Sequence, residues 1–140
     1  MNTIDILRAL VAFDTTSHRS NLELIHWIAD YLAGHGVKVQ LVHSEDRRKA
    51  NLLASIGPDT AGGMVLSGHS DVVPVTGQNW SASPFTLVER NGRLHGRGAA
   101  DMKGFIAACL SAVPSWRRQP LRRPIHLAFS YDEEIGCLGV

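Results

Sequence analysis

The spacing of apolar residues along the chain predicts two amphipathic helices near its start. Residues 3–12 carry apolar side chains at helical spacing. A second such segment follows Ser20, where Glu23 three residues later suggests a capping box. Gly34 or Gly36 supplies the end of this helix. Both helices are expected to cover a core with one face.

The pattern then changes to the spacing of β-strands. Residues 37–43 alternate as a half-buried strand does, and residues 51–57 follow as its hairpin partner after a charged turn. Residues 64–68 and 125–131 are continuous apolar runs, which predict central strands buried on both faces. Asn91-Gly92 lies between two short apolar runs and predicts a further hairpin.

One more helix is predicted between this hairpin and the last strand. Residues 102–113 are apolar and rich in small side chains, and Pro114 is expected to end the helix. Helices and strands thus alternate along the chain, which predicts the α/β class: a mixed sheet flanked by helices. No internal repeat, low-complexity segment or domain boundary is evident.

Composition and net charge mainly exclude certain classes of protein. The chain has 140 residues and a net charge of +1 from 14 basic and 13 acidic residues, so it suits one domain and gives no sign of a nucleic-acid partner. No apolar run reaches the length of a membrane span. Four arginines are interpreted as a solvated loop, with a phosphate site as the lesser alternative: Arg117, Arg118, Arg122 and Arg123.

The two cysteines and the N-terminus suggest where the protein resides. Asp5 and Arg8 interrupt the N-terminal segment, so no secretory signal is expected. Cys109 and Cys137 are therefore predicted to be free thiols in a reducing, cytoplasmic compartment. Cys137 follows the acidic cluster, and we expect it to be a small buried hydrophobe rather than a nucleophile, because no histidine lies nearby in sequence.

Polar residues that carry chemistry come directly after apolar elements. His69 and Asp71 follow one predicted central strand, Glu133 and Glu134 follow the other, and Asp101 precedes the third helix. Ligands of α/β sheets bind at the carboxyl ends of the strands, so these side chains are expected to converge. Closely spaced carboxylates and a histidine predict a metal site at that edge.

Each signal has an ordinary explanation when taken alone. His-x-Asp suits a solvent-facing loop, Asp101 could be a simple N-cap, and Glu133-Glu134 could end a solvated strand. None of these explains why all three recur at one predicted edge. The chain has no Gly-x-Ser-x-Gly elbow and no phosphate-binding loop, so those enzyme classes are not favoured.

The motifs, in their order along the chain, resemble those of the dinuclear-zinc amidohydrolase and exopeptidase family. This family includes acetylornithine deacetylases, succinyl-diaminopimelate desuccinylases, aminoacylases and glutamate carboxypeptidases. The resemblance extends from about residue 5 to residue 140 and rests on these segments: SGHSDVVPV, SPF, GRGAADMKG and DEEIG. DMKGF and AFSYDEEIGCLGV are most similar to the acetylornithine deacetylases among them.

The resemblance implies a role for each candidate residue. His69 would ligate one metal ion, Asp101 would bridge two ions, and Glu134 would ligate the second. Asp71 would orient His69, and Glu133 would be the general acid and base. The implied cofactor is a pair of zinc ions, for which cobalt could substitute. The family also implies a cis peptide bond between Asp101 and its successor, Met102.

The implied reaction is hydrolysis of an N-acylated amino acid, with N-acetylornithine in arginine synthesis as the first choice. A desuccinylase or general aminoacylase is the enzyme alternative, and an inactive metal-binding fragment is the alternative of another class. Residues 1–140 would form the N-terminal portion of a catalytic domain. The remaining ligands and a lid domain, through which the intact enzyme would dimerise, would lie beyond residue 140, so the isolated segment is expected to be inactive.

Overall fold

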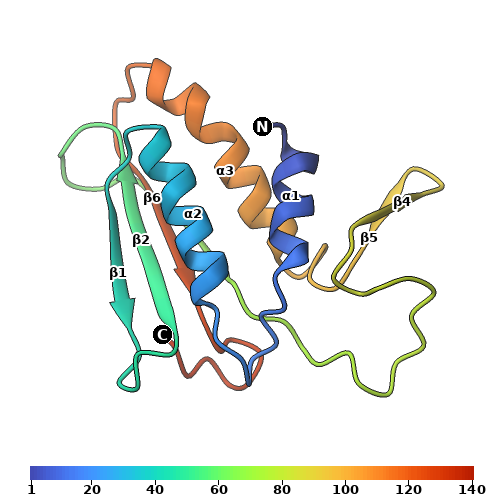
Figure 1. The fold of residues 1–140 in the computed structure, drawn as a ribbon. Helices are drawn as coiled ribbons and strands as arrows, with labels where there is room; N and C mark the ends of the chain where they lie inside the picture. Colours follow the sequence, from blue (N-terminus) through green and yellow to red (C-terminus); the bar gives the residue numbers. More distant parts are fainter.

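Three helices lie against one face of a four-stranded sheet, and a small hairpin extends to one side (Figure 1). The computed structural model describes all residues 1–140. Its elements are α1 (Thr3–Ala12), α2 (Leu22–Gly34), β1 (Val39–His43), β2 (Ala50–Ile56), β3 (Met64–His69), β4 (Val88–Arg90), β5 (Arg93–His95), α3 (Lys103–Arg118) and β6 (Ile125–Ser130). The predicted α/β class with a mixed sheet is confirmed.

The sheet has the strand order β1-β2-β6-β3. β1 pairs with β2 and β2 with β6 in antiparallel fashion, whereas β3 and β6 are parallel. The carboxyl ends of β3 and β6 therefore meet at one edge, with His69 opposite Ser130. This register brings the segments that follow the two strands together, as the site prediction requires.

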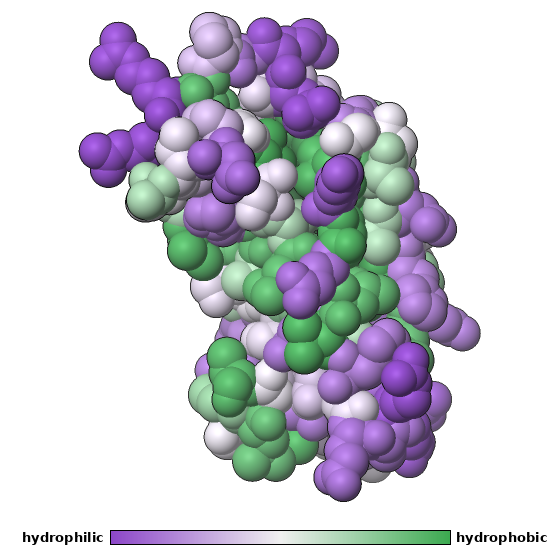
Figure 2. Space-filling view, turned by 90° about the vertical axis from the view of Figure 1, so that its left-hand side faces the viewer, coloured by the Kyte–Doolittle hydropathy of each residue, from purple (hydrophilic) through white to green (hydrophobic).

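The prediction that β3 is a central strand is wrong, whereas β6 does lie inside the sheet. β3 pairs only with β6 and forms the edge, and Met64 and Val65 are each 61% exposed. The helices cover a single face of the sheet (Figure 1). Apolar side chains on the other face therefore meet solvent. Figure 2 shows a band of hydrophobic residues on the side to the left in Figure 1, and the exposed apolar residues of the strands include Val42 and Leu53.

The core lies between the helices and the covered face of the sheet. It is a single cluster of 21 buried residues, with α1, α2 and α3 contributing on one side and β2 and β6 on the other. The predicted capping box of α2 is wrong, because Asn21 is the N-cap residue and the helix begins at Leu22. Ser20 still accepts a hydrogen bond from the Leu22 amide through its hydroxyl oxygen, at 3.1 Å.

Pro114 does not end the third helix, contrary to the sequence prediction. α3 continues to Arg118 with Pro114 in its interior. Proline has no N–H, so it leaves the carbonyl of Leu110, four residues earlier, without its helical donor. The hydroxyl of Tyr31 on α2 lies 3.2 Å from this oxygen and donates to it. A tertiary hydrogen bond thus replaces the missing helical one.

This extension also corrects the interpretation of the arginines. Arg117 and Arg118 belong to the last turn of α3, where positive charge is favourable beside the helix carbonyls. Arg122 and Arg123 lie in the loop before β6, as predicted.

Replacing Tyr31 by phenylalanine is expected to lower the free energy of unfolding by about 1 kcal/mol, the usual net contribution of one hydrogen bond. Denaturation by urea would measure the loss. The matched control is the same change in a Pro114→Ala background, where the restored N–H can donate to Leu110. An equal loss in both backgrounds would show that the Tyr31 hydroxyl does not compensate for the proline.

Candidate metal centre

Three separate segments of the chain bring the predicted site residues to the carboxyl edge of β3 and β6. His69 is the last residue of β3, Glu133 follows β6, and Asp101 lies just before α3. The His69 Nε2 atom is 3.0 Å from Asp101 Oδ1 and 3.8 Å from Glu133 Oε2. The predicted convergence of histidine and acids at this edge is therefore present in the geometry.

The His69 ring is fixed by Asp71, two residues along the chain. Its Nδ1 atom lies 3.0 Å from the Asp71 carbonyl oxygen and 3.5 Å from Asp71 Oδ1. The Asp71 carboxylate, with help from Asp101, raises the pKa of His69 to about 9, although burial opposes the shift. With Nδ1 engaged, Nε2 is the nitrogen that faces the acids and the one available to a metal ion.

Asp71 also contacts Ser17 and the turn after β6. Burial alone would raise its pKa, but hydrogen bonds from His69, Ser17 and two backbone amides lower it to about 2. Asp71 Oδ2 accepts from the Ser17 hydroxyl at 2.7 Å and from the Glu134 amide at 3.2 Å, and Oδ1 accepts from the Glu133 amide at 3.1 Å. This buried carboxylate therefore ties the end of β3 to the turn after β6.

His69, Glu133 and Glu134 form a group of three residues that could hold a metal ion. One ligand atom of each can be chosen so that all three are within 4.8 Å of one another. Imidazole nitrogen and carboxylate oxygen are donors that zinc accepts, so these residues fit a zinc site. Burial raises the pKa of Glu134, and among the nearby acids Asp101 adds most to the shift. A cation placed between them would relieve this repulsion.

Asp101 was predicted to bridge two metal ions beside His69 and Glu134. Its carboxylate contacts His69, but its side chain is 77% exposed and it is not part of the group within 4.8 Å. Glu133, expected to be the proton carrier and no ligand, is part of that group instead. The bridging role of Asp101 remains a prediction. The peptide bond from Asp101 to Met102 is cis, as the resemblance implied.

Sequence reasoning missed two largely buried lysines near the site. Lys49 Nζ lies 2.6 Å from both carboxylate oxygens of Asp132 and from the Ser17 carbonyl oxygen. Lys103 is fully buried, and its Nζ donates to the Phe13 carbonyl oxygen at 2.7 Å. Burial lowers the pKa of Lys103 to about 7. Nothing in the sequence distinguishes Lys49 from the other charges of its turn.

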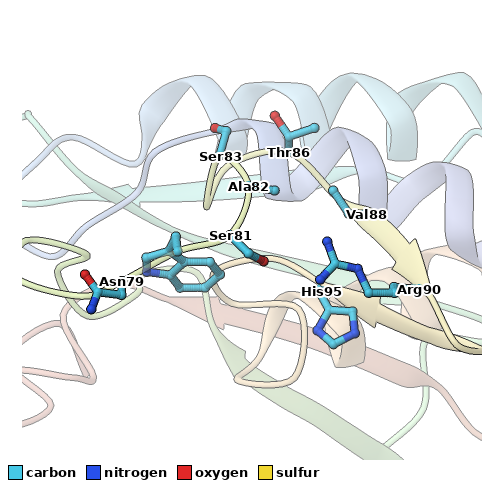
Figure 3. A pocket seen from close by; sticks show the side chains of 9 residues that line it. Asn79, Ser81, Ala82, Ser83, Thr86, Val88, Arg90 and His95 are labelled. Carbon is cyan, nitrogen blue, oxygen red and sulfur yellow. The ribbon is translucent and has the colours of Figure 1, made fainter.

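Other features of the surface lie apart from this centre. The cavity in Figure 3, about 160 Å³ in volume, is lined by the β4–β5 hairpin and the preceding loop, including Trp80 and His95. None of the five predicted site residues lines it. Cys109 and Cys137 are free thiols as predicted, but Cys137 is exposed rather than buried. The chain has no helix that is both long and apolar enough to span a membrane.

Known proteins resemble this chain in sequence and in fold. Residues 65–140 match the profile of peptidase family M20/M25/M40. An acetylornithine deacetylase of Shigella sonnei strain Ss046 is 41% identical over 144 residues, covering 97% of this chain and 37% of its own length. The chain thus spans little more than a third of that curated relative.

Solved structures agree with the sequence comparison. Human carnosine dipeptidase 1 superimposes with a TM-score of 0.83 at 30% identity. The match covers 99% of this chain and 33% of the dipeptidase chain. An M20 family metallo-carboxypeptidase from Sulfolobus solfataricus gives a TM-score of 0.86 at 24% identity. This match covers 99% of this chain and 32% of the carboxypeptidase chain. Fold, motif order and family profile agree, and the chain belongs to peptidase family M20/M25/M40.

Proposed function

We propose that the protein hydrolyses the amide bond of an N-acylated amino acid in a metal-dependent reaction, with N-acetylornithine as the first candidate substrate. The observation that carries this proposal is the group of His69, Glu133 and Glu134, whose ligand atoms come within 4.8 Å of one another. The 41% identity to an acetylornithine deacetylase supports the choice of substrate.

The proposed reaction assigns metal binding and proton transfer to different residues of the site. His69 and Glu134 would hold zinc, together with Asp101, whose exposed carboxylate already lies 3.0 Å from His69 Nε2. Zinc bound there supplies a polarised acyl carbonyl and a water whose pKa falls to about 7. Glu133 has a side chain that is 45% exposed, so it can reach a water molecule at the site. Glu133 would take the proton of that water and deliver it to the leaving amine nitrogen.

Residues 1–140 carry only part of such a site. His69, Asp101 and Glu134 are too few ligands for two four-coordinate zinc ions. The proposed activity therefore belongs to a longer protein in which further ligands close the site, and such a protein is proposed to act in the cytoplasm as a homodimer. The curated relative, of which this chain covers 37%, is of a length that could supply those ligands.

The experiment is an assay of the full-length protein with N-acetylornithine, N-succinyl-diaminopimelate and other N-acetyl amino acids. We expect release of acetate from N-acetylornithine, loss of activity after treatment with a chelator, and recovery when zinc or cobalt is added. Preference for the succinyl substrate or for another acetyl amino acid would make the protein a desuccinylase or an aminoacylase. Metal binding with no hydrolysis of any substrate would favour the inactive metal-binding alternative.

A further inference from the structure

Lys49 forms a largely enclosed ion pair with Asp132 near the site. Its ammonium group lies 2.6 Å from both oxygens of Asp132, and the two side chains are 17% and 11% exposed. The same nitrogen donates to the Ser17 carbonyl oxygen at 2.6 Å. These three acceptors match the three N–H donors of a lysine, so its hydrogen-bonding capacity is fully used. Exposed pairs contribute little, but this pair is largely shielded from water.

The contacts of Lys49 are part of a closed ring of interactions. This ring includes the start of the turn that carries Glu133 and Glu134. The Ser17 carbonyl oxygen accepts a hydrogen bond from Lys49 Nζ, and the Ser17 hydroxyl donates one to Asp71 Oδ2 at 2.7 Å. Asp71 in turn accepts the amides of Glu133 and Glu134, at 3.1 and 3.2 Å. Glu133 is bonded covalently to Asp132, which returns the ring to Lys49. This ring thus holds Asp132 by its side chain, and Glu133 and Glu134 by their backbone amides.

Asp132 has an uncommon backbone conformation at the start of this turn. Its φ angle is 57°, in the left-handed region that side chains other than glycine rarely adopt. This conformation reverses the chain after β6, so that the next two amides both reach the Asp71 carboxylate. The Lys49 ammonium holds the side chain of the residue at which the reversal occurs.

We propose that Lys49 is a positioning residue: through Asp132 and Ser17 it sets the direction of Glu133 and Glu134 toward His69, without touching substrate or metal. The roles of the two glutamates in this statement rest on the proposed function, whereas the geometric claim does not. Loss of Lys49 would therefore displace both glutamates together rather than remove either one.

The test uses the full-length protein with Lys49→Ala and measures hydrogen exchange in a peptide that spans residues 131–136, without added metal. Loss of the ring should expose the Glu133 and Glu134 amides and speed their exchange by about tenfold or more. Asp132→Asn should produce the same change while nearly preserving side-chain shape, and it serves if Lys49→Ala does not fold. Arg8→Met is the control. Arg8 forms an exposed pair with Asp5, three residues earlier, and is far in sequence from Lys49 and Asp132.

A second measurement distinguishes positioning from general stability. In Lys49→Ala we expect kcat to fall about 10–100-fold with KM nearly unchanged, and the visible spectrum of bound cobalt to shift. Propylammonium supplies the atoms that the substitution removes, and it should restore much of kcat and return the spectrum toward wild type. A uniform loss of folded protein would not respond to propylammonium in this way.

The two proposals fail in different ways. Unchanged exchange at residues 131–136 in both Lys49→Ala and Asp132→Asn would overturn the role of Lys49, whatever the protein hydrolyses. Faster exchange together with an unchanged cobalt spectrum and unchanged kcat would also overturn it, because the glutamates would then need no such support. Absence of hydrolysis by the wild-type protein would instead contradict the proposed function and leave the exchange result to decide on Lys49.

Discussion

Replacing Glu133 by glutamine is expected to remove nearly all turnover of the full-length protein while its metal content stays close to wild type. Glutamine has almost the same shape but cannot accept the proton of a water molecule, and general acid–base catalysis contributes about 10²–10⁴-fold. The measurements are kcat on N-acetylornithine and metal content by mass spectrometry. Glu89→Gln, on the exposed strand β4, is the control that should change neither.

The geometry makes this experiment informative, because Glu133 is close enough to His69 to act as a ligand instead. Its Oε2 atom lies 3.8 Å from His69 Nε2. Glu134→Gln should lower both metal content and turnover, since it removes a metal ligand. Equal metal content and equal residual activity in the two variants would show that the proposed division of work between the glutamates is wrong.

Replacing Asp71 by asparagine is expected to damage stability and metal binding together. Asp71 is 2% exposed and accepts hydrogen bonds from Ser17 and from the amides of Glu133 and Glu134. An asparagine NH₂ group would face at least one of these donors and leave it unsatisfied, at a cost of about 1–3 kcal/mol. Metal affinity should fall about 10–100-fold, because the His69 ring also loses its carboxylate partner.

Urea denaturation and a zinc titration of the full-length protein would measure the two effects. Asp59→Asn provides a control, because Asp59 is exposed and makes none of these contacts. If Asp71→Asn bound zinc as tightly as wild type, then Asp71 would not control the orientation of His69. If stability were also unchanged, the three hydrogen bonds would contribute nothing measurable.

The sequence predicted the elements that depend on local pattern and missed those that depend on distant partners. The helix and strand positions, the mixed sheet and the edge at which His69 meets the acids follow from apolar spacing and from the rule for strand ends. The helix beyond Pro114 was missed because the Tyr31 hydroxyl, which donates to the free carbonyl of Leu110, lies 79 residues before Leu110 in sequence.

The same distinction applies to the site. His69, Asp71 and the glutamates were predicted as site residues because each lies at or just beyond the end of an apolar strand. Lys49 was missed because its partner Asp132 is 83 residues away and its turn is charged throughout. The edge position of β3 was missed for a related reason: an apolar run does not reveal how many neighbours a strand has. The spacing of residues in the sequence indicates candidate site residues, but only the folded structure shows which charged side chains form pairs.

The position of β6 has a consequence for how the protein is made. β2 and β3 are consecutive in sequence but do not pair, because β6 lies between them and joins them. A ribosome that releases about 5–20 residues per second would expose β2 and β3 seconds before residues 125–130 emerge. During that interval the two strands have no common partner, so the edge that carries His69 cannot assemble until synthesis has passed β6.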